Sequence, residues 1–229
     1  MSAGAPGGRA PDRTIEVAPE RLAGWLDRFA AAHGALTCSA TPERVDLRAA
    51  DGAIASCAVP LPPLAPNPDA PYAGLLAHAL AERVVAVLLV RRGGYAAGVL
   101  DGGRLLASKV GARHVQARTA AGGWSQQRFA RRRDNQARQA FEAAAEVARR
   151  VWAPHAGRVE ALVTGGDRPA VATVLAAVLA DPGLAPLRAL TPVEVPGLPD
   201  PRQQVLLDVP RRYRAVRVSV TDPVADPPA

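Results

Sequence analysis

Length, composition and charge indicate a globular protein and limit its possible partners. The 229 residues suit one domain with an appendage or two small domains, and 48% of them are apolar, which is enough for a buried core. The net charge at pH 7 is +7, and arginine carries almost all of the positive charge because Lys109 is the only lysine. Either a GC-rich genome that replaces lysine by arginine or an anionic partner such as RNA explains this bias. Composition does not separate the two explanations, but the arginines are unevenly distributed.

Other features argue against a membrane protein and a metal site. Residues 1–12 lack the apolar stretch of a signal peptide, and the longest apolar run, 84–90, is too short to span a bilayer. Cys38 and Cys57 have no metal-binding spacing and are expected to be small buried apolar residues, while the four histidines are scattered. We therefore expect a cytoplasmic protein without membrane association, metal or cofactor.

The N-terminal quarter of the chain predicts a small α+β unit at 14–59, preceded by a disordered tail at 1–13. Pro19 suits the first turn of a helix that ends at Gly34, and Asp51-Gly52 is a hairpin signal. Six prolines between residues 60 and 71 predict an extended linker and a domain boundary. The strands are expected at 44–49 and 54–59.

The region 72–222 predicts a single mixed α/β domain, followed by a tail at 223–229. The continuous apolar run 83–90 is typical of a central strand that is buried on both faces. A meander of strands comes first and alternating helices and strands follow, which predicts a mixed sheet with helices packed on it. Helices are expected at 72–81, 126–152, 168–180 and 202–207, and strands at 83–90, 95–100, 104–110, 113–118, 158–163, 187–195 and 215–220.

The segment 119–138 concentrates the features that suggest chemistry. Gly122 and Gly123 form a flexible loop tip, and Ser125 stands where a helix N-cap is expected. The helix that follows would present a ridge of arginines beside its anion-attracting N-terminus, and Trp124 and Phe129 could stack on bases. A solvated arginine-rich helix after an ordinary loop is the competing interpretation. The arginines are Arg128, Arg131, Arg132, Arg133 and Arg138.

These residues resemble domain two of eukaryotic and archaeal class I release factors, which carries a Gly-Gly-Gln-Ser tip followed by Arg-Phe-x-Arg. The chain has Gly-Gly-Trp-Ser at 122–125 and Arg-Phe-Ala-Arg at 128–131, so that Trp124 replaces the glutamine. This replacement is similar to the Vms-like release-factor (VLRF) branch, especially its actinobacterial members, whose glutamine lies in a Gly-x-x-Gln arrangement matched by 123–126. The resemblance covers about residues 80–220.

The resemblance implies an RNase H-like fold, similar to release-factor domain two, and a peptidyl-tRNA hydrolase that frees nascent chains on stalled ribosomal complexes. Gln126, or alternatively Gln127, would orient the attacking water, while Gly122 and Gly123 let the tip approach. A non-catalytic protein that binds RNA or the ribosome and kept only the fold is the alternative. The implied partners of this monomeric protein are the large ribosomal subunit, peptidyl-tRNA and RNA phosphates, the last contacted by Arg128, Arg131, Arg132, Arg133, Arg138 and Trp124.

Three further motifs point to weaker hypotheses. Gly165-Gly166-Asp167 lacks the lysine of a phosphate loop and is interpreted as a strand-to-helix turn with Asp167 as N-cap. The strands offer no acidic cluster for a two-metal nuclease, and Ser125 lacks the context of a covalent nucleophile. A basic patch near the C-terminus is either a further RNA contact or an exposed strand edge. It consists of Arg211, Arg212, Arg214 and Arg217.

Overall fold

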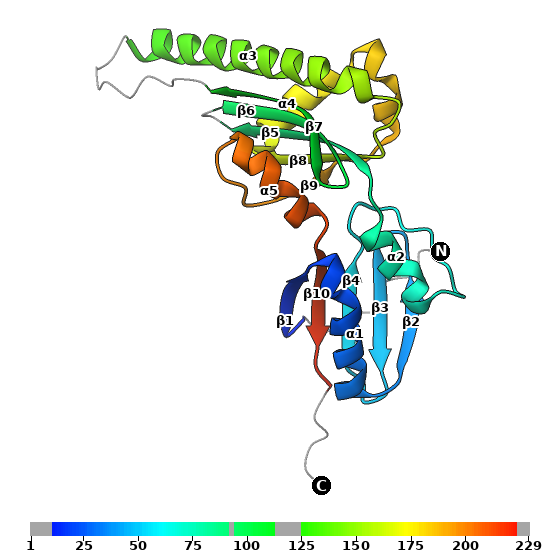
Figure 1. Ribbon diagram of the computed structural model, residues 1–229. Helices are drawn as coiled ribbons and strands as arrows, with labels where there is room; N and C mark the ends of the chain where they lie inside the picture. The colour runs from blue at the N-terminus through cyan, green and yellow to red at the C-terminus, as the bar shows by residue number, and fades with distance from the viewer. Residues whose placement is uncertain (1–10, 92–93, 113–124, 224–229) are drawn as a thin grey trace, which may run out of the picture. The chain divides into compact units, whose positions relative to one another are not determined.

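Two compact units make up the chain in the computed structural model, which describes residues 11–91, 94–112 and 125–223 (Figure 1). Residues 112, 125–135 and 137 are described by their backbone only. The first unit combines Met1–Ala81 with Arg214–Ala229, and the second unit is Glu82–Tyr213.

An antiparallel five-stranded sheet forms the first unit. Its order is β1-β10-β4-β3-β2, so the last described strand of the chain lies between the first strand and β4. The elements are β1 Arg13–Val17, α1 Pro19–His33, β2 Leu36–Ala40, β3 Arg44–Ala49, β4 Ile54–Ala58, the 3-10 helix η1 Pro71–Gly74, α2 Leu75–Leu80 and β10 Val216–Thr221.

The predicted helix and hairpin of this unit are confirmed. α1 begins at Pro19, and it ends at Gly34, whose φ of 89° is readily adopted only by glycine. The turn between β3 and β4 places Gly52 at φ 93°, and the Asp51 carboxylate accepts a hydrogen bond of 2.9 Å from the Ala53 N–H. Local sequence signals therefore determine both features.

The segment 60–71 is not a linker between domains, and the boundary lies further along the chain. Leu61 and Leu64 are buried, and Leu64 belongs to the core of the first unit. The helix after it belongs to the same core, because Leu75 and Ala79 are buried there. The predicted start of the second domain at residue 72 was therefore wrong, since burial of these side chains ties residues 60–81 to the first unit.

The predicted end of that domain was also wrong. The expected strand 215–220 is present as β10, but it pairs with β1 and β4 in the sheet of the first unit. Three of its valines are fully buried there: Val216, Val218 and Val220. The pairing of β10 with β1 also orders residues that were assigned to the N-terminal tail, since β1 begins at Arg13.

The second unit is built on a mixed five-stranded sheet of order β7-β6-β5-β8-β9. β5 pairs antiparallel with β6 and parallel with β8, so the apolar run 84–90 is a central strand as predicted. The elements are β5 Val84–Arg91, β6 Gly94–Asp101, β7 Arg104–Ala112, α3 Ser125–Trp152, the 3-10 helix η2 Ala153–His155, β8 Ala161–Gly166, α4 Arg168–Leu179, the 3-10 helix η3 Pro182–Ala189, β9 Val193–Glu194 and α5 Gln203–Tyr213.

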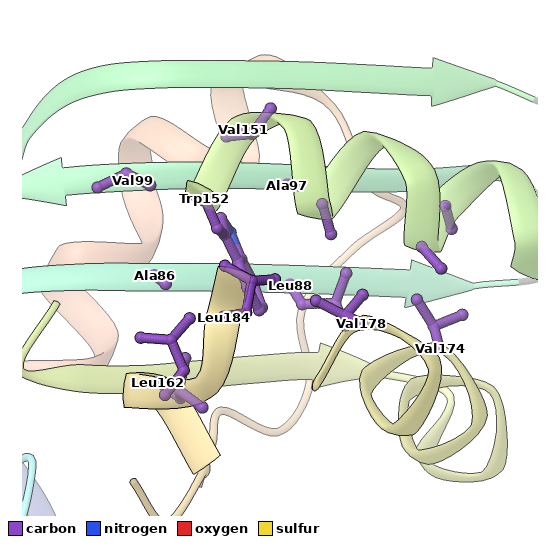
Figure 2. Close-up of a cluster of buried hydrophobic side chains, with 14 of the residues drawn as sticks. Ala86, Leu88, Ala97, Val99, Val151, Trp152, Leu162, Val174, Val178 and Leu184 are labelled. Atoms are coloured by element: carbon purple, nitrogen blue, oxygen red, sulfur yellow. The ribbon is translucent and has the colours of Figure 1, made fainter. Parts of the chain in front are cut away.

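Helices cover both faces of this sheet. α3 and α4 lie on one face, where Trp152 is fully buried beside Leu88 and Leu162, as Figure 2 shows. α5 lies on the other face. Ala97 and Val99 of β6 face α3, so Gly98 between them faces the opposite side, and there Leu206 of α5 packs against it. The mixed α/β fold with flanking helices is thus confirmed for this unit.

Some predicted elements differ in type or position. Of the expected strand 187–195, only Val193–Glu194 pairs as a strand. Its first three residues instead end the 3-10 helix η3, which Asp181 caps at Gly183 and in which Leu184 and Leu187 are buried. The helix expected at 202–207 extends to Tyr213. The strand predicted at 113–118 and the loop 119–124 lie outside the described residues.

Candidate nucleic-acid interface

The long helix α3 holds most of the predicted site. It begins at Ser125, so Gln126 and Gln127 lie in its first turn, where backbone N–H groups have no acceptor within the helix. The predicted RNA-binding arginines 128 and 131–133 follow on the same helix. Gly122, Gly123 and Trp124 lie outside the described residues. β7 ends at Ala112, so residues 113–124 connect the edge strand of the sheet to this helix.

The C-terminal part of α3 is fixed to the sheet. Ala144, Ala145 and Ala148 are fully buried, and small side chains there let the helix approach the strands closely. Trp152 fills the core and donates a hydrogen bond of 3.2 Å from Nε1 to the Gly98 carbonyl of β6. The site is therefore carried by a helix whose far end is anchored in the core.

The strand that leads toward the connecting segment is also held in place. Tyr95 of β6 lies opposite Gly111 of β7, and its ring covers the position where a Cβ on residue 111 would be. Tyr95 also packs against the core formed with α3. Glycine at 111 is thus required by the close approach of an aromatic ring next to the end of β7.

The net charge differs sharply between the two units. The second unit contains 20 of the 28 Lys and Arg residues but only 11 of the 21 Asp and Glu residues, so it carries +9 while the rest of the chain carries −2. A charge of this size on 132 residues favours contact with a polyanion. The uneven distribution of charge therefore favours the anionic-partner explanation for the second unit and not for the first.

Several arginines of the second unit have structural partners. Arg168 forms an ion pair with Glu194, in which its Nε lies 2.7 and 2.8 Å from the two carboxylate oxygens. Arg188 donates to the carbonyl oxygens of Leu179, Ala180 and Asp181 and so caps the C-terminus of α4. Other arginines of this unit that contact acceptors within the protein include Arg91, Arg149, Arg150, Arg158 and Arg212.

A second group of cations in this unit has no hydrogen bond or ion pair within the part of the chain that the structure describes. Arg138, predicted from the sequence as an RNA ligand, is one of them and is exposed on α3. The other four lie on β7 and α5 or directly before α5; Arg211 belongs to the basic patch predicted near the C-terminus, whereas the other three are single basic residues that gave no sequence signal. They are Arg104, Lys109, Arg202 and Arg211.

The basic patch predicted near the C-terminus is not one surface of a single unit. Arg211 and Arg212 belong to α5 in the second unit, whereas Arg214 and Arg217 belong to the first unit. Arg212 donates to the Pro196 carbonyl, and Arg214 forms an ion pair of 3.2 Å with Glu20. The four arginines are close in sequence, but they belong to two different units, and two of them bind acceptors within the protein.

The turn Gly165-Gly166-Asp167 is structural, in agreement with its interpretation from the sequence. Gly166 has φ 112°, and a Cβ there would overlap the Val90 carbonyl of the neighbouring strand. Asp167 occupies the N-cap position of α4, but its side chain makes no capping hydrogen bond. The close approach of β5 and β8 thus explains the second glycine without any ligand.

The described residues show neither a metal centre nor a membrane segment. Among them, no three His, Cys, Asp or Glu side chains gather in a group that could hold a metal ion. The carboxylate of Glu160, the residue before β8, accepts a hydrogen bond of 3.1 Å from the Val84 N–H at the start of β5. No helix in the described ranges is both long and apolar enough to cross a bilayer.

The second unit is a mixed α/β domain in which a long arginine-rich helix follows a meander of strands. Together with the family match below, this arrangement defines the class as release-factor-like. The model of the Actinobacteria/chloroflexi VLRF1 release factor family matches residues 83–219, and the chain belongs to this family. No curated protein matches the chain. Membership implies a release-factor-related role in translation, with interaction with the ribosome and tRNA in general. The match starts with the second unit and continues into β10 of the first.

Proposed function

We propose that the protein is a peptidyl-tRNA hydrolase that frees nascent chains from tRNA on stalled ribosomal complexes. The observation that carries the proposal is the match to the VLRF1 release factor family over residues 83–219, which includes the whole segment 119–138. The charge of +9 on the second unit supports it, because ribosomal RNA and tRNA are the polyanions that a release factor meets.

The reaction is attack of water on the ester carbonyl that links the peptide to tRNA. A glutamine amide does not titrate near neutral pH, so Gln126 would act by orienting the water rather than by removing its proton. Backbone N–H groups near the start of α3 would stabilise the developing oxyanion. Most of the rate enhancement would then come from positioning, with the ribosome supplying part of the site.

The architecture around the site suits a positioning mechanism. Gln126 and Gln127 lie in the first turn of α3, and the same helix ends at the fully buried Trp152. Gly122 and Gly123 would let the tip approach the ester. Arg128, Arg131, Arg132, Arg133 and Arg138, together with Trp124, would hold RNA.

The test is release of a labelled nascent peptide from purified stalled ribosome–peptidyl-tRNA complexes. We expect the wild type to release the peptide and Gln126→Ala to lose about 100-fold in rate, comparable to the loss of one transition-state hydrogen-bonding group. The matched control is Gln139→Ala, which removes an exposed glutamine from the same helix away from its first turn. It should release the peptide at the wild-type rate.

The outcomes of this test separate the hypotheses. If Gln127→Ala is inactive while Gln126→Ala is active, the reaction stands and the residue assignment is wrong. Trp124, which replaces the classical glutamine, favours a non-catalytic ribosome-binding protein as the second candidate. Absence of release by the wild type above background, with ribosome binding intact, would establish that candidate instead.

A further inference from the structure

Four of the five cations of the second unit that have no partner among the described residues lie along one edge of the unit, while the fifth, Arg138, lies on α3. Arg104 and Lys109 are exposed on β7, which pairs with β6 and is the edge of the sheet in the described chain. Arg202 and Arg211 are exposed at the two ends of α5. These four residues have no hydrogen bond or ion pair among the described residues, unlike most of the other described arginines of the unit.

The two elements run side by side in opposite directions. Residues at the start of α5 line the same groove as residues 108–110 of β7. At the other end, Pro210 lies beside Gly103, where a Cβ would be 3.8 Å from its side chain. Lys109 and Arg202 are therefore at one end of this edge, and Arg104 and Arg211 are at the other.

The groove at the Lys109 end carries hydrogen-bond donors. It has a volume of about 640 Å³ and is lined by Ser108, Lys109 and Val110 of β7 and by residues 200–203. Ser108, Arg202 and Gln203 can all donate from their side chains. Asp200 is the acid in this lining, and it forms an ion pair with Arg91 at 3.5 Å. The groove therefore matches an anion with several acceptor oxygens.

The distance between the two ends fits an extended polyanion. Five residues of strand from Arg104 to Lys109 span about 17 Å. Nine residues from Arg202 to Arg211 span about 14 Å along a helix. A single small anion cannot bridge ends this far apart, but consecutive phosphates of one nucleic acid strand can.

We propose that the β7–α5 edge, defined by Arg104, Lys109, Arg202 and Arg211, is a second RNA-binding surface that contacts the phosphodiester backbone. It is separate in sequence from the predicted arginine ridge at the start of α3. The choice of RNA rather than an acidic protein rests on the proposed function, while the basic edge itself does not. Such contacts position a protein on RNA without reading its sequence.

The test measures binding of fluorescently labelled tRNA by anisotropy at several salt concentrations. The slope of log K against log salt is negative, and each lost phosphate contact reduces its magnitude by about 0.7 to 0.9. We expect the double variant Lys109→Gln with Arg202→Gln to reduce the magnitude of the slope by about 1.5. The double variant Arg104→Gln with Arg211→Gln should reduce it by a similar amount. The matched control is Arg150→Gln with Arg158→Gln, which removes the same charge from exposed arginines that have acidic partners.

The control pair should leave the slope close to the wild-type value. Equal losses in the control and in the edge variants would overturn the proposal, since net charge alone would then explain binding. Unchanged slopes in the edge variants would overturn it as well. If the wild type releases no peptide but the slopes change as expected, the proposed function fails and the surface stands. If the wild type releases the peptide but the slopes of the edge variants are unchanged, the proposed function stands and the proposed surface fails.

Discussion

The two cysteines of the first sheet show how position on a strand decides reactivity. Cys57 on β4 is fully buried, and burial raises the pKa of its thiol to about 12. Cys38 on β2 is exposed, contrary to the expectation that both would be buried, because β2 is an edge strand among the described ones and most of its residues are exposed. Partial burial, with a smaller contribution from Asp46, raises the pKa of Cys38.

These surroundings predict selective labelling. At pH 8 only about one in ten thousand Cys57 thiols would be ionised, and the thiolate is the reactive form. A maleimide should therefore modify one thiol in the folded protein and both in denaturant, and mass spectrometry of peptides should locate the first at Cys38. Cys38→Ser should label only after unfolding. Equal labelling rates for the two native thiols would contradict the buried position of Cys57.

At the scale of elements, the contact between β6 and β7 is a second test of packing. Gly111→Ala would drive a Cβ into the Tyr95 ring, and an added methyl group in a close-packed place costs about 1–3 kcal/mol in free energy of unfolding. Gly157→Ala is the control, because a Cβ added at Gly157 would have no neighbour within 4 Å, and it should change stability by less than about 0.5 kcal/mol. Urea unfolding measures both.

A double-mutant cycle identifies the cause. Tyr95→Ala removes the ring that the new methyl group meets, so Tyr95→Ala with Gly111→Ala should be destabilised by less than the sum of the single changes. Additive effects would contradict the approach of the Tyr95 ring as the reason why residue 111 is glycine.

The elements also show which sequence signals are reliable. β5 was predicted from its continuous apolar run, which burial of the strand on both faces explains. α1 was predicted from apolar residues at helical spacing between Pro19 and Gly34, and Gly34 has a positive φ in the structure. β1 and β2 were missed, since five-residue strands with mostly exposed side chains have no clear alternation. In the candidate site, clustered arginines on α3 were visible in the sequence, whereas Lys109 and Arg202 line the same groove only because α5 packs beside β7.

At the scale of the whole molecule, the chain crosses between two units that have different charges and separate cores. β10 was recognised as a strand, but its pairing with β1, about 200 residues away, has no local signal. The family match ends at residue 219, inside β10, so it includes part of a strand that completes the other unit. The first unit therefore depends on residues from both ends of the described chain.

Separate cores predict that each unit can lose its structure without the other. Val218 is fully buried in the first core and Val174 in the second, and a carboxylate at either place would be buried without a partner. Val218→Asp should abolish hydrogen-exchange protection in β3 and β4 while protection in β5 and β8 remains. Val174→Asp is the reciprocal variant and should give the opposite pattern. Because the proposed RNA contacts lie in the second unit, Val218→Asp should also keep its tRNA binding, and loss of protection throughout the chain in both variants would show that the units fold as one.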